Sequence, residues 1–118
     1  MINFSEAEFK CCRECKLGFE SMNEDFVRML DIARTHANTP FKLTSTIRCS
    51  VHNKTAGGSE TSSHLTGCAA DIACADSSSR YKILYGLQQA GFERIGIANN
   101  FIHADSDKHK PKELIWTY

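Results

Sequence analysis

The run SSHLTGCAADIAC, residues 62–74, constrains the fold of this chain more than any other segment. Gly67 allows the chain to reverse direction. The apolar residues that follow it are short side chains, as expected of a buried strand that begins near Asp71. His64 lies before the turn and Asp71 lies after it. The fold is therefore expected to bring His64 and Asp71 toward one point beside a buried strand.

Two further segments have the 3.6-residue periodicity of helices. Residues 22–38 predict the stronger helix, capped by Asn23 and ending near Asn38. Residues 77–91 predict a second helix, capped from its serines and stopped at the terminal glycine. The expected inner faces of the two helices comprise Phe26, Met29, Leu30 and Ala33 in the first, and Tyr81, Ile83, Leu84 and Leu87 in the second.

Alternating apolar residues predict the remaining strands. Residues 41–47 are β-branched and alternate, whereas residues 49–61 are polar and predict a surface loop. Residues 94–105 predict a hairpin around Asn99–Asn100, two residues that tolerate the positive φ angles of a tight turn. Residues 113–118 predict a last strand. Strands that are adjacent late in the chain indicate an α+β fold, with a mainly antiparallel sheet and two main helices packed on it.

Size and charge narrow the class of protein. The 118 residues suit one domain spanning 1–118, which we expect to be monomeric. Lys plus Arg and Asp plus Glu are both 14, so a broad electrostatic surface for nucleic acid or anionic lipid is not expected. No apolar run approaches the roughly 18 residues of a membrane span, and the N-terminus has no secretory pattern. We expect synthesis in the cytoplasm without a signal peptide and no membrane insertion.

The sequence does not determine whether the six cysteines are reduced, form disulfides or bind a metal. They are Cys11, Cys12, Cys15, Cys49, Cys68 and Cys74. Six thiols allow roughly 15 disulfide pairings, and the expectation without a signal peptide is reduced thiols. A structural zinc ion on Cys12 and Cys15 is the alternative, although one C-x-x-C without a second clear pair is a weak motif.

Two of the five histidines have carboxylates at suggestive positions. His36, His52 and His109 are expected to be ordinary surface residues. His64, Asp71 and His103 are a plausible three-ligand set for zinc, with the fourth position left to water. Such an ion would lower the pKa of its water to about 7. The spacing leaves an alternative open, in which His64 caps a turn, Asp71 caps a strand end and His103 packs in a hairpin.

The motifs around these residues closely resemble those of the zinc D-Ala-D-Ala carboxypeptidase family of peptidoglycan peptidases, which share the Hedgehog/DD-peptidase fold. The family pattern S-x-H-x-x-G-x-A-x-D and a later H-x-D are matched by Ser62, His64, Gly67, Ala69, Asp71, His103 and Asp105. An Arg after a strand, an Asn and a Gly-Gly follow in the family order at Arg48, Asn53 and Gly57–Gly58. The resemblance extends from about Phe4 to Tyr118.

The resemblance implies that zinc binds to His64, Asp71 and His103. It also implies that Arg48 reaches the active-site cleft, where a guanidinium can bind a substrate carboxylate or steady a tetrahedral oxyanion. Ser62 is then expected to hydrogen-bond near the metal or substrate, and otherwise to be a turn residue. Trp116 is expected either to line the cleft or to belong to the core.

One position departs from the better-known relatives. They carry an acidic general base three residues before the last histidine ligand, and here that residue is Asn100, which cannot accept a proton from water. Asp105 is the nearest substitute, because residues 103 and 105 of a strand share one face. It is expected either to reach the zinc-bound water or to orient His103.

The resemblance implies a zinc peptidase that hydrolyses peptidoglycan stem-peptide bonds involving D-amino acids. Both D-Ala-D-Ala carboxypeptidase and L-Ala-D-Glu endopeptidase activities occur among the relatives. The short phage-type members suggest a phage or prophage lysis protein that acts on the cell wall after release, or as part of a phage particle. The alternative is a non-catalytic zinc-binding module of the same fold. A cysteine hydrolase using Cys68 with His64 is disfavoured, because it leaves Asp71 and His103 without a shared role.

Overall fold

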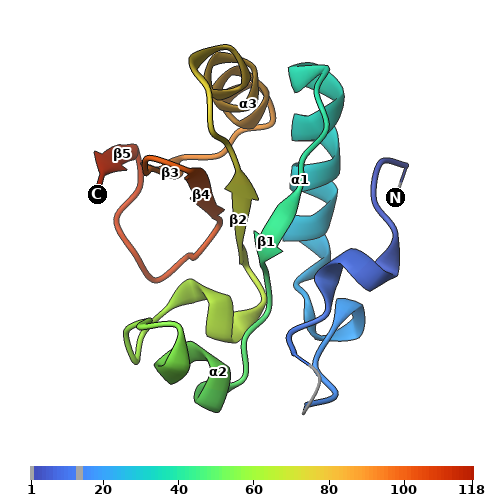
Figure 1. The fold of residues 1–118 in the computed structure, drawn as a ribbon, viewed down its shortest axis with the longest axis vertical. Coiled ribbons are helices and arrows are strands. Elements are labelled where there is room, and N and C mark those ends of the chain that lie inside the picture. Colours follow the sequence, from blue (N-terminus) through green and yellow to red (C-terminus); the bar gives the residue numbers. More distant parts are fainter. Residues whose placement is uncertain (1, 13–14) are drawn as a thin grey trace.

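The structure, a computed structural model, describes residues 2–12 and 15–118 (Figure 1). This part of the chain contains α-helices, β-strands and short 3-10 turns (η). In chain order the elements are η1 Glu6–Phe9, η2 Phe19–Ser21, α1 Glu24–Ala37, β1 Leu43–Ser45, α2 Ser50–Thr55, η3 Ser63–Thr66, β2 Ala69–Ala73, α3 Ser77–Gln89, β3 Arg94–Ile97, β4 Phe101–Asp105 and β5 Leu114–Thr117. No helix in these two ranges is long and apolar enough to span a membrane.

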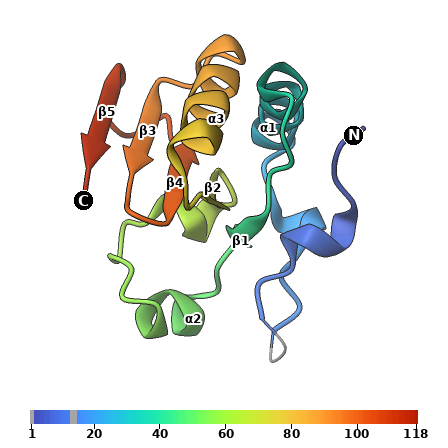
Figure 2. The same ribbon diagram turned by 45° about the horizontal axis from the view of Figure 1, so that its top comes forward.

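The five strands form one sheet in the order β1-β2-β4-β3-β5. The pairs β1–β2, β2–β4 and β3–β4 are antiparallel, which confirms the α+β prediction with a mainly antiparallel sheet. The last strand, β5, pairs in parallel with β3, so the sheet is mixed. Figure 2 shows β5 at one edge of the sheet, beside β3.

The two faces of the sheet have different environments. Residues alternate between the faces along a strand, and Ile72 of β2 and Ile102 of β4 are both fully buried in the hydrophobic core. Helices α1 and α3 lie side by side and supply a large part of that core (Figures 1 and 2). Asp71 and His103 therefore lie on the opposite face, away from these two helices.

Most of the predicted local structure is present. The Asn23 side chain accepts a hydrogen bond from the Phe26 N–H at the start of α1, and Asn38 closes the helix in the left-handed conformation. Phe26, Leu30 and Ala33 are buried, and Met29 packs at the edge of the core. Strand β1 is confirmed but shorter than predicted.

Three details of the sequence prediction are wrong. The predicted loop 49–61 contains helix α2, which begins where the Cys49 side chain accepts a hydrogen bond from the His52 N–H. Tyr81 is 75% exposed and lies off the inner face of α3. Asp76, rather than a serine, caps that helix.

The turn between β3 and β4 also differs from its prediction. Among the described residues, Asn38 and Glu113 are the non-glycine residues with positive φ. Asn99–Asn100 therefore connects the strands without the positive φ angles that were predicted. The turn is closed by a 3.0 Å hydrogen bond from the Ala98 N–H to the Phe101 carbonyl.

The contact between α1 and α3 depends on a glycine, which gives a testable prediction. A Cβ atom on Gly86 would contact the Ala33 carbonyl oxygen and lie 2.7 Å from the Ala37 Cβ. Alanine favours a helix over glycine by about 1 kcal/mol, but overpacking costs about 1–3 kcal/mol. We expect Gly86→Ala to lower the free energy of unfolding, as measured by urea denaturation. Gln88→Ala on the exposed side of α3 is the control, and an equally stable Gly86→Ala variant would contradict this packing.

Candidate functional site

Strand register brings two of the predicted metal ligands together. Asp71 of β2 and His103 of β4 are direct partners across the antiparallel ladder. The distance between Asp71 Oδ1 and His103 Nδ1 is 2.9 Å. His64 reaches the same carboxylate oxygen from η3, with its Nε2 atom 3.4 Å from Asp71 Oδ1. The three side chains therefore converge on one point, as the sequence motifs predict.

The turn that carries His64 has a defined local cause. The Ser62 side chain accepts a 3.3 Å hydrogen bond from the His64 N–H and so caps η3. Gly67 ends the turn with φ of 72°, a conformation that favours glycine. A Cβ atom there would also lie 2.9 Å from the Met22 Cα. Gly67 thus allows the histidine turn to pack directly on the chain that precedes α1.

Hydrogen bonds outside the cluster orient both imidazoles. His64 Nδ1 lies 2.7 Å from the Thr46 carbonyl oxygen, an acceptor, so this nitrogen carries the proton and Nε2 keeps its lone pair. His103 Nε2 lies 2.8 Å from Asp105 Oδ2, so its Nδ1 faces Asp71. Carboxylate or carbonyl acceptors of this kind fix the tautomer of metal-binding histidines.

The charges of the site are strongly coupled. Burial alone would raise the pKa of the Asp71 carboxyl, but hydrogen bonds with His103 and His64 outweigh burial and hold that pKa well below its usual value. Burial alone would lower the pKa of the His103 imidazole, but hydrogen bonds with Asp105 and Asp71 raise it above its usual value. Asp71 is therefore ionised at neutral pH, and a cation bound at His103 would compete with its proton.

Asp105 is hydrogen-bonded to several other groups in the site. Its side chain is only 1% exposed. Besides His103 Nε2, it accepts hydrogen bonds from Arg94 Nε at 2.7 Å and from the Asp107 N–H at 3.1 Å. Of the two roles that the sequence left open for Asp105, these contacts match the orientation of His103.

Arg48 lies on the other side of Asp71. Its guanidinium is 3.5 Å from Asp71 Oδ2 and also donates to Ser45 Oγ at 2.8 Å and to Asn53 Oδ1 at 3.2 Å. Gly58 covers this arrangement closely, because a Cβ atom there would contact Asn53 Oδ1 and lie 3.0 Å from Arg48 Nη1. The buried Asn53 and the glycine thus hold the guanidinium at the ligand cluster.

An aromatic wall completes the site on the side of β5. A Cβ atom on Gly96 would lie 2.5 Å from Trp116 Nε1, so the absence of a side chain on β3 lets the indole lie across this strand. The Trp116 and His103 rings are 5.6 Å apart between centroids. Trp116, Tyr118 and Phe101 line a cleft of about 350 Å³ together with the ligand cluster. Trp116 therefore lines the cleft, one of its two predicted alternatives.

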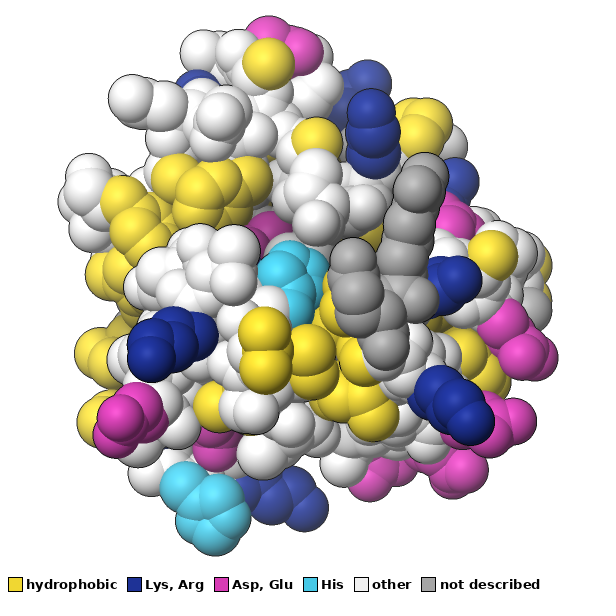
Figure 3. Space-filling view, turned by 60° about the horizontal axis from the view of Figure 1, so that its bottom comes forward, with side chains coloured by type: hydrophobic (Ala, Val, Ile, Leu, Met, Phe, Trp, Pro, Cys, Tyr) yellow, Lys and Arg dark blue, Asp and Glu magenta, His cyan; other side chains and the backbone are white. Residues whose placement is uncertain are grey.

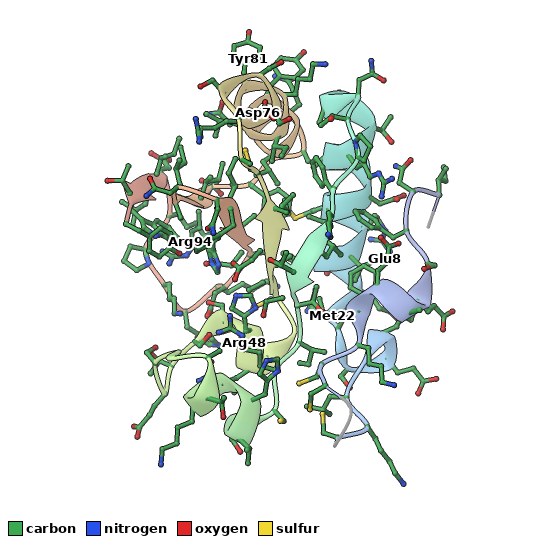
Figure 4. The ribbon with its side chains drawn as sticks, viewed as in Figure 1. Glu8, Met22, Arg48, Asp76, Tyr81 and Arg94 are labelled. Carbon is green, nitrogen blue, oxygen red and sulfur yellow. The ribbon has the colours of Figure 1, made fainter. Side chains whose placement is uncertain are left out.

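Several site residues were not predicted from the sequence. Arg94 bonds Asp105 and also stacks over Trp116, with its guanidinium carbon 5.1 Å from the ring centroid. The buried Ser63 hydroxyl donates to Asp107 Oδ2 at 2.7 Å and accepts from Lys110 Nζ at 2.9 Å. Of these residues, only Arg94 could have been found from the sequence, because alternation along β3 and β4 places it on the same face of the sheet as His103. Figure 4 shows Arg48 and Arg94 pointing toward the same region between the sheet and α2.

The cluster fits a zinc ion by its donor set. His64, Asp71 and His103 each offer one ligand atom, and the three atoms lie within 4.8 Å of one another. Two imidazole nitrogens and one carboxylate oxygen are ligands that zinc accepts, with a fourth position left open in catalytic sites. The cleft borders the same three residues, so a fourth ligand has access to them.

Comparison with known proteins agrees with this arrangement. The family model described as peptidase M15 matches residues 2–105, which include the ligand cluster, Arg48 and Asp105. The chain therefore belongs to the M15 peptidase family. Among curated proteins no relative of the chain is found.

Proposed function

We propose that the protein is a zinc peptidase that hydrolyses peptidoglycan stem peptides at a bond involving a D-amino acid. The observation that carries this proposal is the convergence of His64 Nε2, Asp71 Oδ1 and His103 Nδ1 at the wall of a cleft that also holds Arg48. Membership of the M15 peptidase family supports the same reaction class. D-Ala-D-Ala carboxypeptidase and L-Ala-D-Glu endopeptidase activities are the two candidates for the bond.

The side chains around the ligand cluster bind the substrate and orient the metal ligands. Zinc, when bound, polarises a carbonyl and lowers the pKa of water to about 7. Arg48 presents a fixed guanidinium that can bind the terminal carboxylate of a stem peptide or the oxyanion of the transition state. Trp116 and Tyr118 supply an aromatic surface for the peptide. Asp105 and the Thr46 carbonyl hold the two imidazoles in position.

A charge-balanced surface is consistent with an uncharged polymer segment or a zwitterionic peptide as the substrate. Figure 3 views the end of the molecule at which α2 lies and shows basic and acidic side chains interspersed there. The formal net charge of the whole chain is zero. We further propose, from the resemblance to short phage-type members of the family, that the protein takes part in phage or prophage lysis and acts on the bacterial cell wall after release or from a phage particle.

One observation favours a second candidate function, a zinc-binding module without hydrolytic activity. Among the described residues that line the cleft, Asp71 and Asp105 are the acidic ones, and both are bonded within the site. Asn100 occupies the position of the general base and lies exposed in the β3–β4 turn, outside the cleft lining. A binding module needs no proton acceptor, so this arrangement would suffice for it.

Mass spectrometry of muropeptides distinguishes the two functions. Purified peptidoglycan fragments are incubated with the zinc-loaded protein, with the chelated protein and with the chelated protein resupplied with zinc. A peptidase releases products of defined mass that disappear with the chelator and return with zinc, and these masses identify the bond. If the zinc-loaded protein binds muropeptides but leaves every one intact, the binding module is correct.

The role of Asp105 gives a separate prediction. In Asp105→Asn the side-chain amide cannot accept hydrogen bonds from both His103 and Arg94 as the carboxylate does. We expect zinc affinity to fall about 10–100-fold, as is usual when the partner of a ligating histidine is lost. Competition with a chromophoric chelator measures this affinity, with the exposed Asp25→Asn as the control. Unchanged zinc affinity with a large loss of kcat would instead assign proton transfer to Asp105.

A further inference from the structure

A second cluster of metal-binding side chains lies outside the cleft. The sulfurs of Cys11, Cys12, Cys15 and Cys49 lie within 4.8 Å of one another. Three of these cysteines belong to the N-terminal segment, and Cys49 comes from the start of α2, 38 residues after Cys11. The fold thus supplies the fourth thiol that was missing from the C-x-x-C motif of the sequence.

The spacing of the sulfurs suits one tetrahedral ion. With Zn–S bonds of about 2.3 Å, the sulfurs of a tetrahedral site are about 3.8 Å apart. The Cys12 and Cys15 sulfurs are 3.3 Å apart, and no two of the four sulfurs are more than 4.8 Å apart. A disulfide bond is about 2.05 Å long, and two disulfides would bring the sulfurs together only in pairs. A single group of four therefore fits a metal ion better than disulfides.

Hydrogen-bond donors around the cluster suit thiolate sulfurs. The Cys49 N–H lies 3.2 Å from Cys11 Sγ, and the His52 N–H lies 3.3 Å from Cys49 Sγ. The His52 ring adds a third group, with Nδ1 3.2 Å from Cys11 Sγ. Four thiolates and one divalent ion carry a net charge of −2, and donors of this kind stabilise such a charge. His52, expected to be an ordinary surface residue, thus belongs to this cluster.

We propose that Cys11, Cys12, Cys15 and Cys49 bind a structural zinc ion that fastens the N-terminal segment to the start of α2. Four protein ligands leave no open coordination position, which is the arrangement of structural sites. Cys49 directly follows Arg48 and caps α2, which also carries Asn53. The ion therefore anchors the segment that holds Arg48 against Asp71.

Zinc content per chain tests this proposal independently of the peptidase. Inductively coupled plasma mass spectrometry is applied to the wild type, to His64→Ala, to the double variant Cys12→Ser/Cys15→Ser and to Cys74→Ser, a buried cysteine elsewhere in the fold. We expect two zinc ions in the wild type and in Cys74→Ser, and one in each of the other two proteins. A double variant that keeps the wild-type zinc content would overturn the cysteine site. A His64→Ala protein that keeps both ions would instead contradict the cleft site.

Two measurements keep the test decisive if the double variant does not fold. Cobalt loaded into His64→Ala should give the thiolate-to-cobalt charge-transfer absorption of a four-sulfur site. A chelator should also lower the Tm of the same variant, because a bound metal stabilises the folded state, and should expose four additional thiols to a thiol reagent. Two results would refute the proposal. One is an intact mass that is lower by the hydrogens lost in disulfide formation. The other is a Tm and a count of reactive thiols that the chelator does not change.

Discussion

His64→Ala is expected to abolish peptidoglycan cleavage and to remove one zinc ion. His64 is 3% exposed, and its Nε2 atom is one of the three ligand atoms that the described residues supply to the cleft cluster. A metal supplies several kcal/mol of transition-state stabilisation, so the expected loss is about 10³-fold or more in kcat/KM. Quantified product masses from a muropeptide digest measure this loss, and metal analysis measures the zinc.

Two comparisons make this result specific to the metal. The substitution leaves the Thr46 carbonyl without its imidazole donor, which costs about 1–3 kcal/mol of stability. Thermal unfolding of the variant therefore has to remain cooperative for the activity to be interpreted. His36→Ala on the exposed end of α1 is the matched control and should keep both activity and zinc. Cleavage by a zinc-depleted His64→Ala protein at the wild-type rate would refute the metal mechanism.

Residue spacing predicted that the ligand side chains would converge, and the resemblance to the zinc carboxypeptidase family identified them as a metal site. Alternation along β4 places His103 on the face opposite Ile102, and an antiparallel β2 then puts Asp71 beside it. Gly67 marks the turn that returns His64 to the same point. These relations depend on local geometry and on one strand pairing, so residue type and spacing predict the convergence, but they do not by themselves distinguish a metal site from three structural residues.

The features that were missed depend on contacts between distant segments. Helix α2 is six residues long and polar, so its periodicity is too short to separate from a loop, and the Cys49 cap that starts it is an unusual one. The edge strand β5 carries no signal for pairing in parallel with β3. The approach of Cys49 to the N-terminal cysteines likewise results from tertiary packing, which sequence spacing does not specify.

Arg48→Ala is expected to lower kcat/KM about 10²–10³-fold, the range found when one oxyanion donor is removed. The zinc of the cleft should remain, because Arg48 contacts the Asp71 oxygen that faces away from the histidines. A rise in KM with little change in kcat would indicate binding of a substrate carboxylate. A fall in kcat would indicate stabilisation of the transition state.

Arg48→Lys separates the charge of this residue from its geometry. A lysine keeps the positive charge but loses the planar fork that contacts Ser45, Asn53 and Asp71 together. We expect it to recover only part of the activity, with zinc content unchanged. Arg28→Ala, which removes an exposed arginine paired with Asp25, is the control and should behave as the wild type. If Arg48→Ala loses its cleft zinc, Arg48 acts by holding Asp71; if kcat/KM stays at the wild-type value, the guanidinium does not contact the substrate.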